Sequence, residues 1–397
     1  MATDQQAISY SAIQIDKREI TQSLLNIEDK TRSNLFAWNG QFSPQFIEAL
    51  LDQYADERYV VADPFLGSGT VLYECARKGI AAIGNELNPS AYYMAKIYEV
   101  CRLNKNERKL LIQYLDRKID IISLRPNPLD MLSYLSKNDS SPTAKSIVSL
   151  IVVLLDLFNN QFSIDLLFEK WNSLKSIILS LPFTNMNLTA MLGDARRLNI
   201  QDNEIDLIIT SPPYINVFNY HQKYRRSVEA LGYDVLRIAR KEIGSNRKNR
   251  GNRFLTVIEY CVDMSLALKE MIRVCKENSR IILVVGKESN VLSTAFCNSE
   301  LIYGLASGVH ELPLILKQQR AFKNKYGQMI YEDILHFQSV KTNVKTISDA
   351  YLFEQSRLVA VKLLKEKFDG FDSTNKNYPL LKAAIHNAQT VMPSEGR

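Results

Sequence analysis

The sequence of 397 residues lacks several features that would assign it to other classes of protein. Its five cysteines are scattered and form no Cys-x-x-Cys spacing, which argues against a disulfide framework and against a zinc site. The longest apolar run, residues 149–155, stops at Asp156, well short of the roughly 20 residues that a membrane span needs. The amino terminus has no basic cluster followed by an apolar core, so we expect no signal peptide and a cytoplasmic protein.

The chain has enough apolar residues for one large domain or two. Hydrophobic residues make up 46% of the sequence, and no segment has the composition of a disordered region. The net charge of +6 is only mildly basic. It permits a nucleic-acid partner without demonstrating one.

A glycine-rich turn follows an early apolar segment. Residues 59–62 predict a strand, Asp63-Pro64-Phe65-Leu66-Gly67-Ser68-Gly69-Thr70 follows, and the apolar spacing after Thr70 predicts a helix. Glycines let the backbone approach a ligand, and the amino terminus of the helix offers N–H groups to a carboxylate. Asp63 at the strand end can pair with an ammonium group. A carboxylate and an ammonium on one carbon describe an amino acid.

Two phosphate-binding alternatives fit this turn poorly. A nucleotide-binding P-loop needs a lysine after its last glycine, and none follows Gly69. A dinucleotide fold needs a third glycine or alanine where this chain has Leu72. A second predicted strand, residues 81–84, ends near Glu86, about where an acidic residue binds a ribose hydroxyl pair in this topology.

A second turn follows the predicted buried strand at residues 205–210. Ser211-Pro212-Pro213-Tyr214 ends this strand, and the two prolines donate no backbone hydrogen bonds although their carbonyls still accept them. The turn therefore offers a stiff set of acceptors, with the Ser211 hydroxyl on one side and the Tyr214 ring on the other. Such a surface suits a flat ligand that bears an amino group, and a nucleobase fits that description.

Together these two turns resemble the motifs of amino-group DNA methyltransferases, with Ser-Pro-Pro-Tyr in the form typical of cytosine-N4 enzymes. The Asp-Pro-Phe-Leu-Gly-Ser-Gly-Thr segment resembles the S-adenosylmethionine loop of these enzymes. The resemblance also implies that Phe42 and Ser43 contact the methionine end of the cofactor and that Asp194, in Gly193-Asp194, accepts from its adenine. The implied cofactor residues are Phe42, Ser43, Asp63, Pro64, Phe65, Gly67, Ser68, Gly69, Thr70, Glu86 and Asp194.

A strongly basic segment follows the second turn. Residues 215–253 hold ten basic and three acidic residues, a surplus of seven, and tyrosines and glycines interleave with the charges. We interpret this run as one loop that contacts DNA phosphates. The expected DNA-binding residues are Tyr220, Lys223, Arg225, Arg226, Arg247, Lys248 and Arg250.

The remaining pattern predicts how the chain is organised. We expect a seven-stranded, mostly parallel α/β sheet of the Rossmann-like methyltransferase type from residues 32–103 and 187–340, with a helical insertion at 104–186 and a helical extension at 341–397. Within the insertion, helices are predicted at 110–122, 145–158 and 164–181. The segments 311–316 and 328–337 predict an antiparallel strand pair connected by 317–326.

The leading hypothesis is methyl transfer from S-adenosylmethionine to cytosine N4 in double-stranded DNA, by direct displacement on a flipped base and without a metal. A cognate restriction endonuclease is a further expected partner. Adenine N6 as the target, RNA as the substrate, and a nucleic-acid-binding module without catalysis stay as alternatives. A nucleotide-dependent oxidoreductase is disfavoured by Leu72, and methylation of a ring carbon by the tyrosine at position 214, where that chemistry needs a cysteine.

Overall fold

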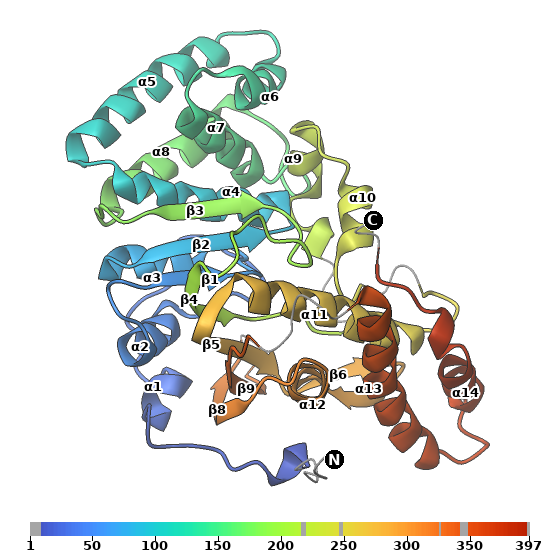
Figure 1. Cartoon of the computed structure of the whole chain (residues 1–397). Coiled ribbons are helices and arrows are strands. Elements are labelled where there is room, and N and C mark those ends of the chain that lie inside the picture. Colours follow the sequence, from blue (N-terminus) through green and yellow to red (C-terminus); the bar gives the residue numbers. More distant parts are fainter. Residues whose placement is uncertain (1–8, 216–219, 246–248, 325–326, 342–347, 395–397) are drawn as a thin grey trace. The chain divides into compact units, whose positions relative to one another are not determined.

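The computed structural model of the chain (Figure 1) describes residues 9–215, 220–245, 249–324, 327–341 and 348–394. Its main sheet has seven strands in the order β3-β2-β1-β4-β5-β9-β8. The pairs β1–β2, β2–β3 and β4–β5 are parallel, whereas β5–β9 and β8–β9 are antiparallel. This arrangement confirms the predicted fold class, a seven-stranded and mostly parallel α/β sheet of the Rossmann-like methyltransferase type.

The chain divides into two compact units, each of which is discontinuous in sequence. We call Lys30–Asn199 with Phe218–Glu242 the glycine-loop unit, and Met1–Asp29, Ile200–Val217 and Ile243–Arg397 the Pro-Pro unit. This division differs from the domain boundaries expected from the sequence, which stay predictions.

The glycine-loop unit contains two successive strand–turn–helix segments. The strands β1 (Val60–Asp63) and β2 (Ala81–Glu86) pair in register from Val60 opposite Ala81 to Asp63 opposite Gly84. The helices α3 (Thr70–Lys78) and α4 (Pro89–Lys96) follow them, and β3 (Leu188–Leu192) pairs with β2. The helix α2 (Pro44–Tyr54) begins after Ser43, as the sequence predicts.

Four helices separate α4 from β3 along the chain. They are α5 (Lys105–Ser123), α6 (Pro128–Asn138), α7 (Pro142–Leu154) and α8 (Ile164–Ser180), and Figure 1 shows them gathered beyond the edge strand β3. The predicted helix at 145–158 is too long, because Asp156 adopts a left-handed backbone with φ of 46°. The indole Nε1 of buried Trp171 on α8 donates to Asp116 on α5 over 2.7 Å, so these two helices are fixed by a polar bond as well as by apolar packing.

In the Pro-Pro unit, the almost fully buried helix α11 (Leu255–Val274) connects β4 (Ile205–Thr210) to β5 (Cys275–Gly286). The hairpin of β6 (Glu288–Val291) and β7 (Thr294–Cys297), the helix α12 (Asn298–Tyr303) and a π-helical turn η4 (Gly304–Val309) precede β8 (Leu314–Lys323) and β9 (Met329–Gln338). The helices α13 (Asp349–Asp369) and α14 (Tyr378–His386) complete the unit.

The predicted antiparallel pair is confirmed, but its connection was placed wrongly. Residues 317–323 belong to β8 rather than to the turn. An amino-terminal segment runs beside this strand: the backbone N–H of Asp16 donates to the carbonyl of Lys317 over 2.7 Å. Asn26, the last residue of α1 (Gln22–Asn26), accepts from the N–H of Ala321. The polar side chains of β8 thus lie in a paired strand, a context that local sequence does not reveal.

Candidate active site

The glycine loop joins β1 to α3 through two residues with positive φ. Gly67 has φ of 55° and Gly69, which precedes the first residue of α3, has φ of 90°. A Cβ atom at Gly69 would lie 2.8 Å from the Ala95 methyl group and from the Tyr98 ring. Glycine is therefore required at 69 both for the backbone conformation and for close packing against the helices that follow β2.

Side-chain bonds tie residues 34–43 to this loop. The Ser68 hydroxyl donates to Gln41 over 2.7 Å, and the Thr70 hydroxyl donates to Asn34 over 2.9 Å. The Asn34 amide in turn donates to the carbonyl of Phe42 over 2.7 Å. The structure therefore brings the two predicted cofactor segments, around Phe42 and around Gly67, into one place.

The Ser43 hydroxyl makes no capping bond although Ser43 is the N-cap residue of α2. Its oxygen is buried and, among the described residues, has no hydrogen-bond partner. A buried hydroxyl without a partner is costly, so a ligand group that bonds to Ser43 would relieve this cost. The site thus fits a polar ligand beside the glycine loop.

Two carboxylates lie at the ends of neighbouring parallel strands. Asp63 is 2% exposed, and its Oδ1 accepts from the N–H of Phe65 over 3.1 Å. Glu86 accepts from the N–H of Gly67 and from the N–H of Asn88, each over 2.7 Å. Burial raises the pKa of Glu86 to about 7. The Glu86 carboxyl therefore holds the glycine loop by a hydrogen bond, and its pKa lies near neutral pH.

Asp194 has an internal partner that the sequence did not indicate. Its carboxylate accepts from Arg196 over 2.6 and 2.9 Å, and Arg196 also donates to the carbonyl of Lys241. Asn85, at the end of β2, donates to the carbonyl of Gly193 over 3.1 Å. Arg196 and Asn85 thus fix the turn in which Asp194 lies, and any adenine contact of Asp194 would share its carboxylate with Arg196.

The Ser-Pro-Pro-Tyr turn follows β4 in the Pro-Pro unit, as predicted. The Tyr214 hydroxyl lies 3.4 Å from the Ser211 hydroxyl and donates to Glu332 over 3.3 Å. A Cβ atom at Gly286 would lie 2.8 Å from the Tyr214 ring, and one at Gly244 would lie 2.9 Å from the Tyr214 carbonyl oxygen. Glycines at these two positions therefore make room for Tyr214, and nothing in the local sequence links them to it.

The basic segment is not the single loop that the sequence predicted. It contains a 3-10 turn η3 (Tyr220–Gln222) and the helices α9 (Arg225–Ala230) and α10 (Val235–Lys241). Several of the predicted DNA-binding side chains already have protein partners. Tyr220 stacks on Trp38 with ring centroids 6.1 Å apart, and Lys223 donates to the carbonyl of Ala37.

Two further arginines of this segment also contact the protein. Arg225 pairs with Glu229 over 2.8 Å, and the Arg226 guanidinium lies 5.7 Å from the Phe158 ring centroid. Arg250 is exposed, while Arg247 and Lys248 lie outside the described residues. Trp38, which also lies near Gly67, is the residue here that sequence reasoning missed.

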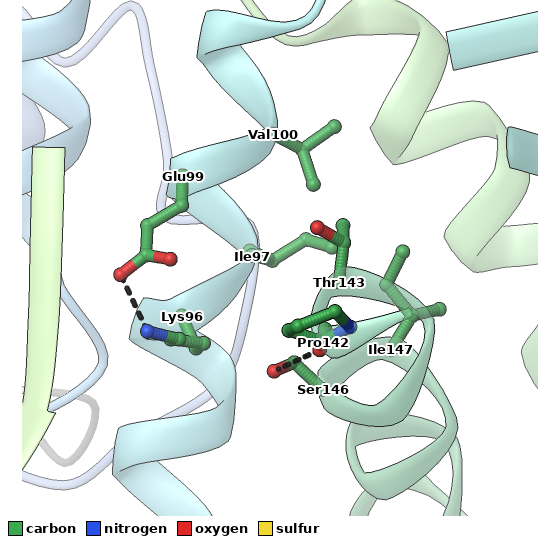
Figure 2. Close-up of a pocket in the computed structure, with 8 residues that line it drawn as sticks. All are labelled: Lys96, Ile97, Glu99, Val100, Pro142, Thr143, Ser146 and Ile147. Carbon is green, nitrogen blue, oxygen red and sulfur yellow. Dashed lines mark hydrogen bonds and ion pairs between the residues drawn. The ribbon is translucent and has the colours of Figure 1, made fainter. Parts of the chain in front are cut away.

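A cavity of about 90 Å³ lies in the glycine-loop unit (Figure 2). It is lined by residues of α4, the 3-10 turn η2 (Ile97–Arg102) and the first two turns of α7. Lys96 donates to Glu99 over 2.7 Å, and the Ser146 hydroxyl donates to the carbonyl of Pro142 over 3.1 Å (Figure 2). Because these polar groups bond within the protein, the cavity offers a ligand little polar recognition.

Within the described part of the chain, no three His, Cys, Asp or Glu side chains gather in a way that could hold a metal ion. No helix in those same ranges is long and apolar enough to cross a membrane.

Comparison with known proteins finds a matching family model and a similar protein. Residues 2–97 match the model of the N6/N4 methylase family, described as DNA methylase. The chain is also 21% identical over 447 aligned positions to the type II methyltransferase M.MjaII of Methanocaldococcus jannaschii, covering 79% of this chain and 82% of that protein. Both matches are to methyltransferases, and the family match supports methylation of amino groups in DNA. S-adenosylmethionine is the cofactor that this class of enzyme uses, and the glycine-loop residues fit it.

Solved structures give weaker similarities. A SAM-dependent methyltransferase of Methanosarcina mazei is 12% identical with a TM-score of 0.35, over 73% of this chain and 97% of that one. The rRNA methyltransferase aviRa of Streptomyces viridochromogenes is 8% identical with a TM-score of 0.30, over 88% and 99%.

Proposed function

We propose that the protein transfers a methyl group from S-adenosylmethionine to an exocyclic amino group in double-stranded DNA, and that the target atom is cytosine N4. The observation that carries the proposal is the glycine loop with a buried carboxylate, Asp63, and a half-buried one, Glu86, at the ends of adjacent strands, in a chain that also ends a strand with Ser-Pro-Pro-Tyr.

Different residues around the glycine loop would bind different parts of the cofactor. Asp63 would accept from the ammonium group, and the first N–H groups of α3 would bind the carboxylate. Glu86 would accept from the ribose hydroxyls, and Ser43 would bond to a polar group beside the loop. Asp194 would accept from the adenine amine. When bound, the cofactor supplies an electrophilic methyl group.

The Ser-Pro-Pro-Tyr turn would hold the base. An exocyclic amino nitrogen is a poor nucleophile, because its lone pair is delocalised into the ring. Hydrogen bonds from its N–H groups to the Ser211 hydroxyl and the Pro212 carbonyl favour a tetrahedral nitrogen whose lone pair points at the methyl group. A base inside a duplex cannot reach such a turn, so it must flip out, and the Tyr214 ring stacks on it.

The choice of cytosine over adenine rests on Ser211, since Ser-Pro-Pro-Tyr resembles the cytosine-N4 form of the motif. The test is to express the protein in cells without DNA methylation, digest their DNA to nucleosides and separate the products by mass. N4-methylcytosine is the expected product. N6-methyladenine as the sole product would show that the target base is adenine, and would still agree with methylation of an amino group.

A restriction endonuclease that cuts the same sequence would be the biological counterpart of this activity. Methylated DNA from these cells should then resist that endonuclease, while unmethylated DNA is cut. Sequencing the modified positions identifies the recognition site against which such a partner is sought.

A further inference from the structure

The Tyr214 hydroxyl lies between two polar side chains from different parts of the Pro-Pro unit. It donates to Glu332 Oε1 over 3.3 Å, and it lies 3.4 Å from the Ser211 hydroxyl. Glu332 is 118 residues from Tyr214 in sequence and lies on the antiparallel strand β9. The catalytic turn is therefore connected to a carboxylate that its own motif does not contain.

The register of the sheet places Glu332 there. On one side it lies opposite Gly286 of β5, whose missing side chain leaves space for the Tyr214 ring. On the other side it lies opposite Arg320 of β8, which donates to Glu332 Oε2 over 2.6 Å. Glu332 and Arg320 are 9% and 5% exposed. Arg320 thus holds one carboxylate oxygen and Tyr214 bonds to the other.

The chemistry of these groups fixes the direction of the hydrogen bonds. A carboxylate accepts and does not donate, so the single proton of the Tyr214 hydroxyl goes to Glu332. The remaining interaction of that hydroxyl with Ser211 then requires Ser211 to donate. With its proton directed at Tyr214, the Ser211 oxygen presents only lone pairs to its surroundings.

We propose that Glu332 and Tyr214 are positioning residues that orient the Ser211 hydroxyl as a hydrogen-bond acceptor for the amino group of the target base. The inference rests on the proposed function, because it explains how Ser211 performs the role assigned to it there. A serine hydroxyl can donate as well as accept, and an oxygen whose proton pointed at the amino group would repel it. The distance of 3.4 Å is long for O–H···O, and such contacts tighten when substrate binds.

The decisive variant is Glu332→Gln, because it reverses the polarity of the chain of bonds. Arg320 only donates, so it holds the amide oxygen of the new side chain and turns the NH₂ group toward Tyr214. Tyr214 then accepts from the amide and donates to Ser211, whose proton is left to face the base. We expect kcat to fall about 100-fold, as for the loss of a well-placed catalytic hydrogen bond, with the KM for DNA and the Kd for S-adenosylmethionine changed less than about threefold.

Removing the Tyr214 hydroxyl should reverse part of this loss. Tyr214→Phe keeps the stacking ring and frees Ser211 to rotate, so we expect kcat to fall only about tenfold. In the double variant Tyr214→Phe with Glu332→Gln, the introduced amide has no Tyr214 hydroxyl to reorient, so it cannot affect Ser211. The kcat of the double variant should therefore equal that of Tyr214→Phe, about tenfold higher than the kcat of Glu332→Gln alone. A carboxylate that merely supports the fold would give equal or larger losses in the double variant.

The controls are Tyr331→Phe, on the same strand with an exposed ring, and Glu288→Gln, an exposed carboxylate of β6. Both should keep wild-type kcat, and thermal melting checks that each variant is folded. Losses in kcat that add in the double variant would overturn the positioning role and leave the proposed function intact. A folded wild-type protein that binds the cofactor but transfers no methyl group to any DNA would overturn the proposed function, and the positioning role with it.

Discussion

The carboxylate of Asp63 is nearly inaccessible to solvent, yet it ends a strand instead of lying in the middle of one. A charged group in such a position is expected to bind another charge, and we assign it the ammonium group of the cofactor. Asp63→Asn keeps the shape of the side chain and its bond to the N–H of Phe65 while removing the negative charge. We expect the cofactor Kd to rise roughly 10- to 100-fold, as for loss of a hydrogen bond to a charged group.

Calorimetric titration measures this change, and Asp56→Asn is the matched control. Asp56 precedes the same strand but is only partly buried and pairs with Arg58 over 2.8 Å. Its replacement should leave the Kd unchanged. Equal affinities in Asp63→Asn and wild type would remove Asp63 from the cofactor site.

We expect Glu86 to make cofactor binding depend on pH. Burial raises its pKa from the ordinary 4.5 to about 7, so the folded protein takes up a proton between these values that the unfolded chain does not. Stability contributed by this group therefore falls as pH rises from about 4.5 to about 7. Affinity should change in the opposite sense, because the ionised carboxylate is the better acceptor of the ribose hydroxyls: it should drop about tenfold from pH 8 to pH 6.

In Glu86→Gln this pH dependence should disappear, since the amide does not titrate. The measurement is the Kd for S-adenosylmethionine at half-unit steps of pH in both proteins. Parallel profiles would show that a different group, on the protein or on the cofactor, is titrating.

At the scale of elements, the turn between β1 and α3 depends on the packing of the next helices. Gly69→Ala would force an alanine to φ of 90° and place its methyl group 2.8 Å from Ala95 and Tyr98. Gly79→Ala, at the other end of α3, meets the same backbone strain at φ of 67° but has no atom within 4 Å. We expect Gly79→Ala to cost about 1–2 kcal/mol and Gly69→Ala about 1–3 kcal/mol more.

Urea unfolding of the two variants measures this difference. A comparable loss in both would mean that α4 and η2 shift to accept the methyl group. In that case Gly69 would be needed only for its backbone conformation.

The basic segment at residues 215–253 should bind DNA phosphates through its exposed side chains. Arg237 and Arg240 on α10 and Arg250 are exposed, unlike Tyr220, which packs on Trp38. Removing one phosphate-binding side chain should lower the slope of log affinity against log salt by about 0.9, so replacing all three by Gln should flatten it by up to about 2.7. Lys362→Gln with Lys365→Gln, on exposed positions of α13, is the control. An unchanged slope in the triple variant would show that these arginines face solvent and do not bind DNA phosphates.

Several elements were predictable because their signals are local. Buried strands at 60–63, 81–86 and 205–210 stop at Asp63, Glu86 and a Pro-Pro pair, and each boundary is marked by a carboxylate or a proline. By contrast, Lys317 and Arg320 resemble a polar connection, yet they lie in β8, where Arg320 pairs with Glu332 and Lys317 lies 3.8 Å from the centre of the Tyr10 ring. Such partners come from distant parts of the chain, so no local pattern indicates them.

The same limit applies to the candidate site. The sequence motifs supplied Ser211 and Tyr214, but Glu332 and Gly286 reach Tyr214 only through strand register. The strands β3 and β4 also follow one another along the chain, yet β3 pairs with β2 and β4 pairs with β5. Order along the chain does not determine order in a sheet with crossover connections.

At the scale of the whole molecule, all the proposed cofactor residues fall within the glycine-loop unit, from Phe42 to Asp194. A ligand that binds only the native state stabilises it by RT ln(1 + [L]/Kd), which is about 2.7 kcal/mol at a concentration of 100 Kd. We therefore expect S-adenosylmethionine to raise the unfolding free energy of the wild-type protein by about this amount, and of Asp63→Asn by far less at the same concentration.

Hydrogen exchange locates the origin of that stabilisation. The N–H groups of Gly67 and Asn88 both donate to Glu86, so any ligand that orders Glu86 should slow the exchange of these two amides more than it slows those of α13 in the Pro-Pro unit. Asp63→Asn at the same cofactor concentration should show much weaker protection of both amides, because its expected Kd is about 10- to 100-fold higher. Protection concentrated in the Pro-Pro unit, with no change at Gly67 and Asn88, would contradict the placement of the cofactor at the glycine loop, because stabilisation by a ligand is strongest at the amides whose acceptors it orders.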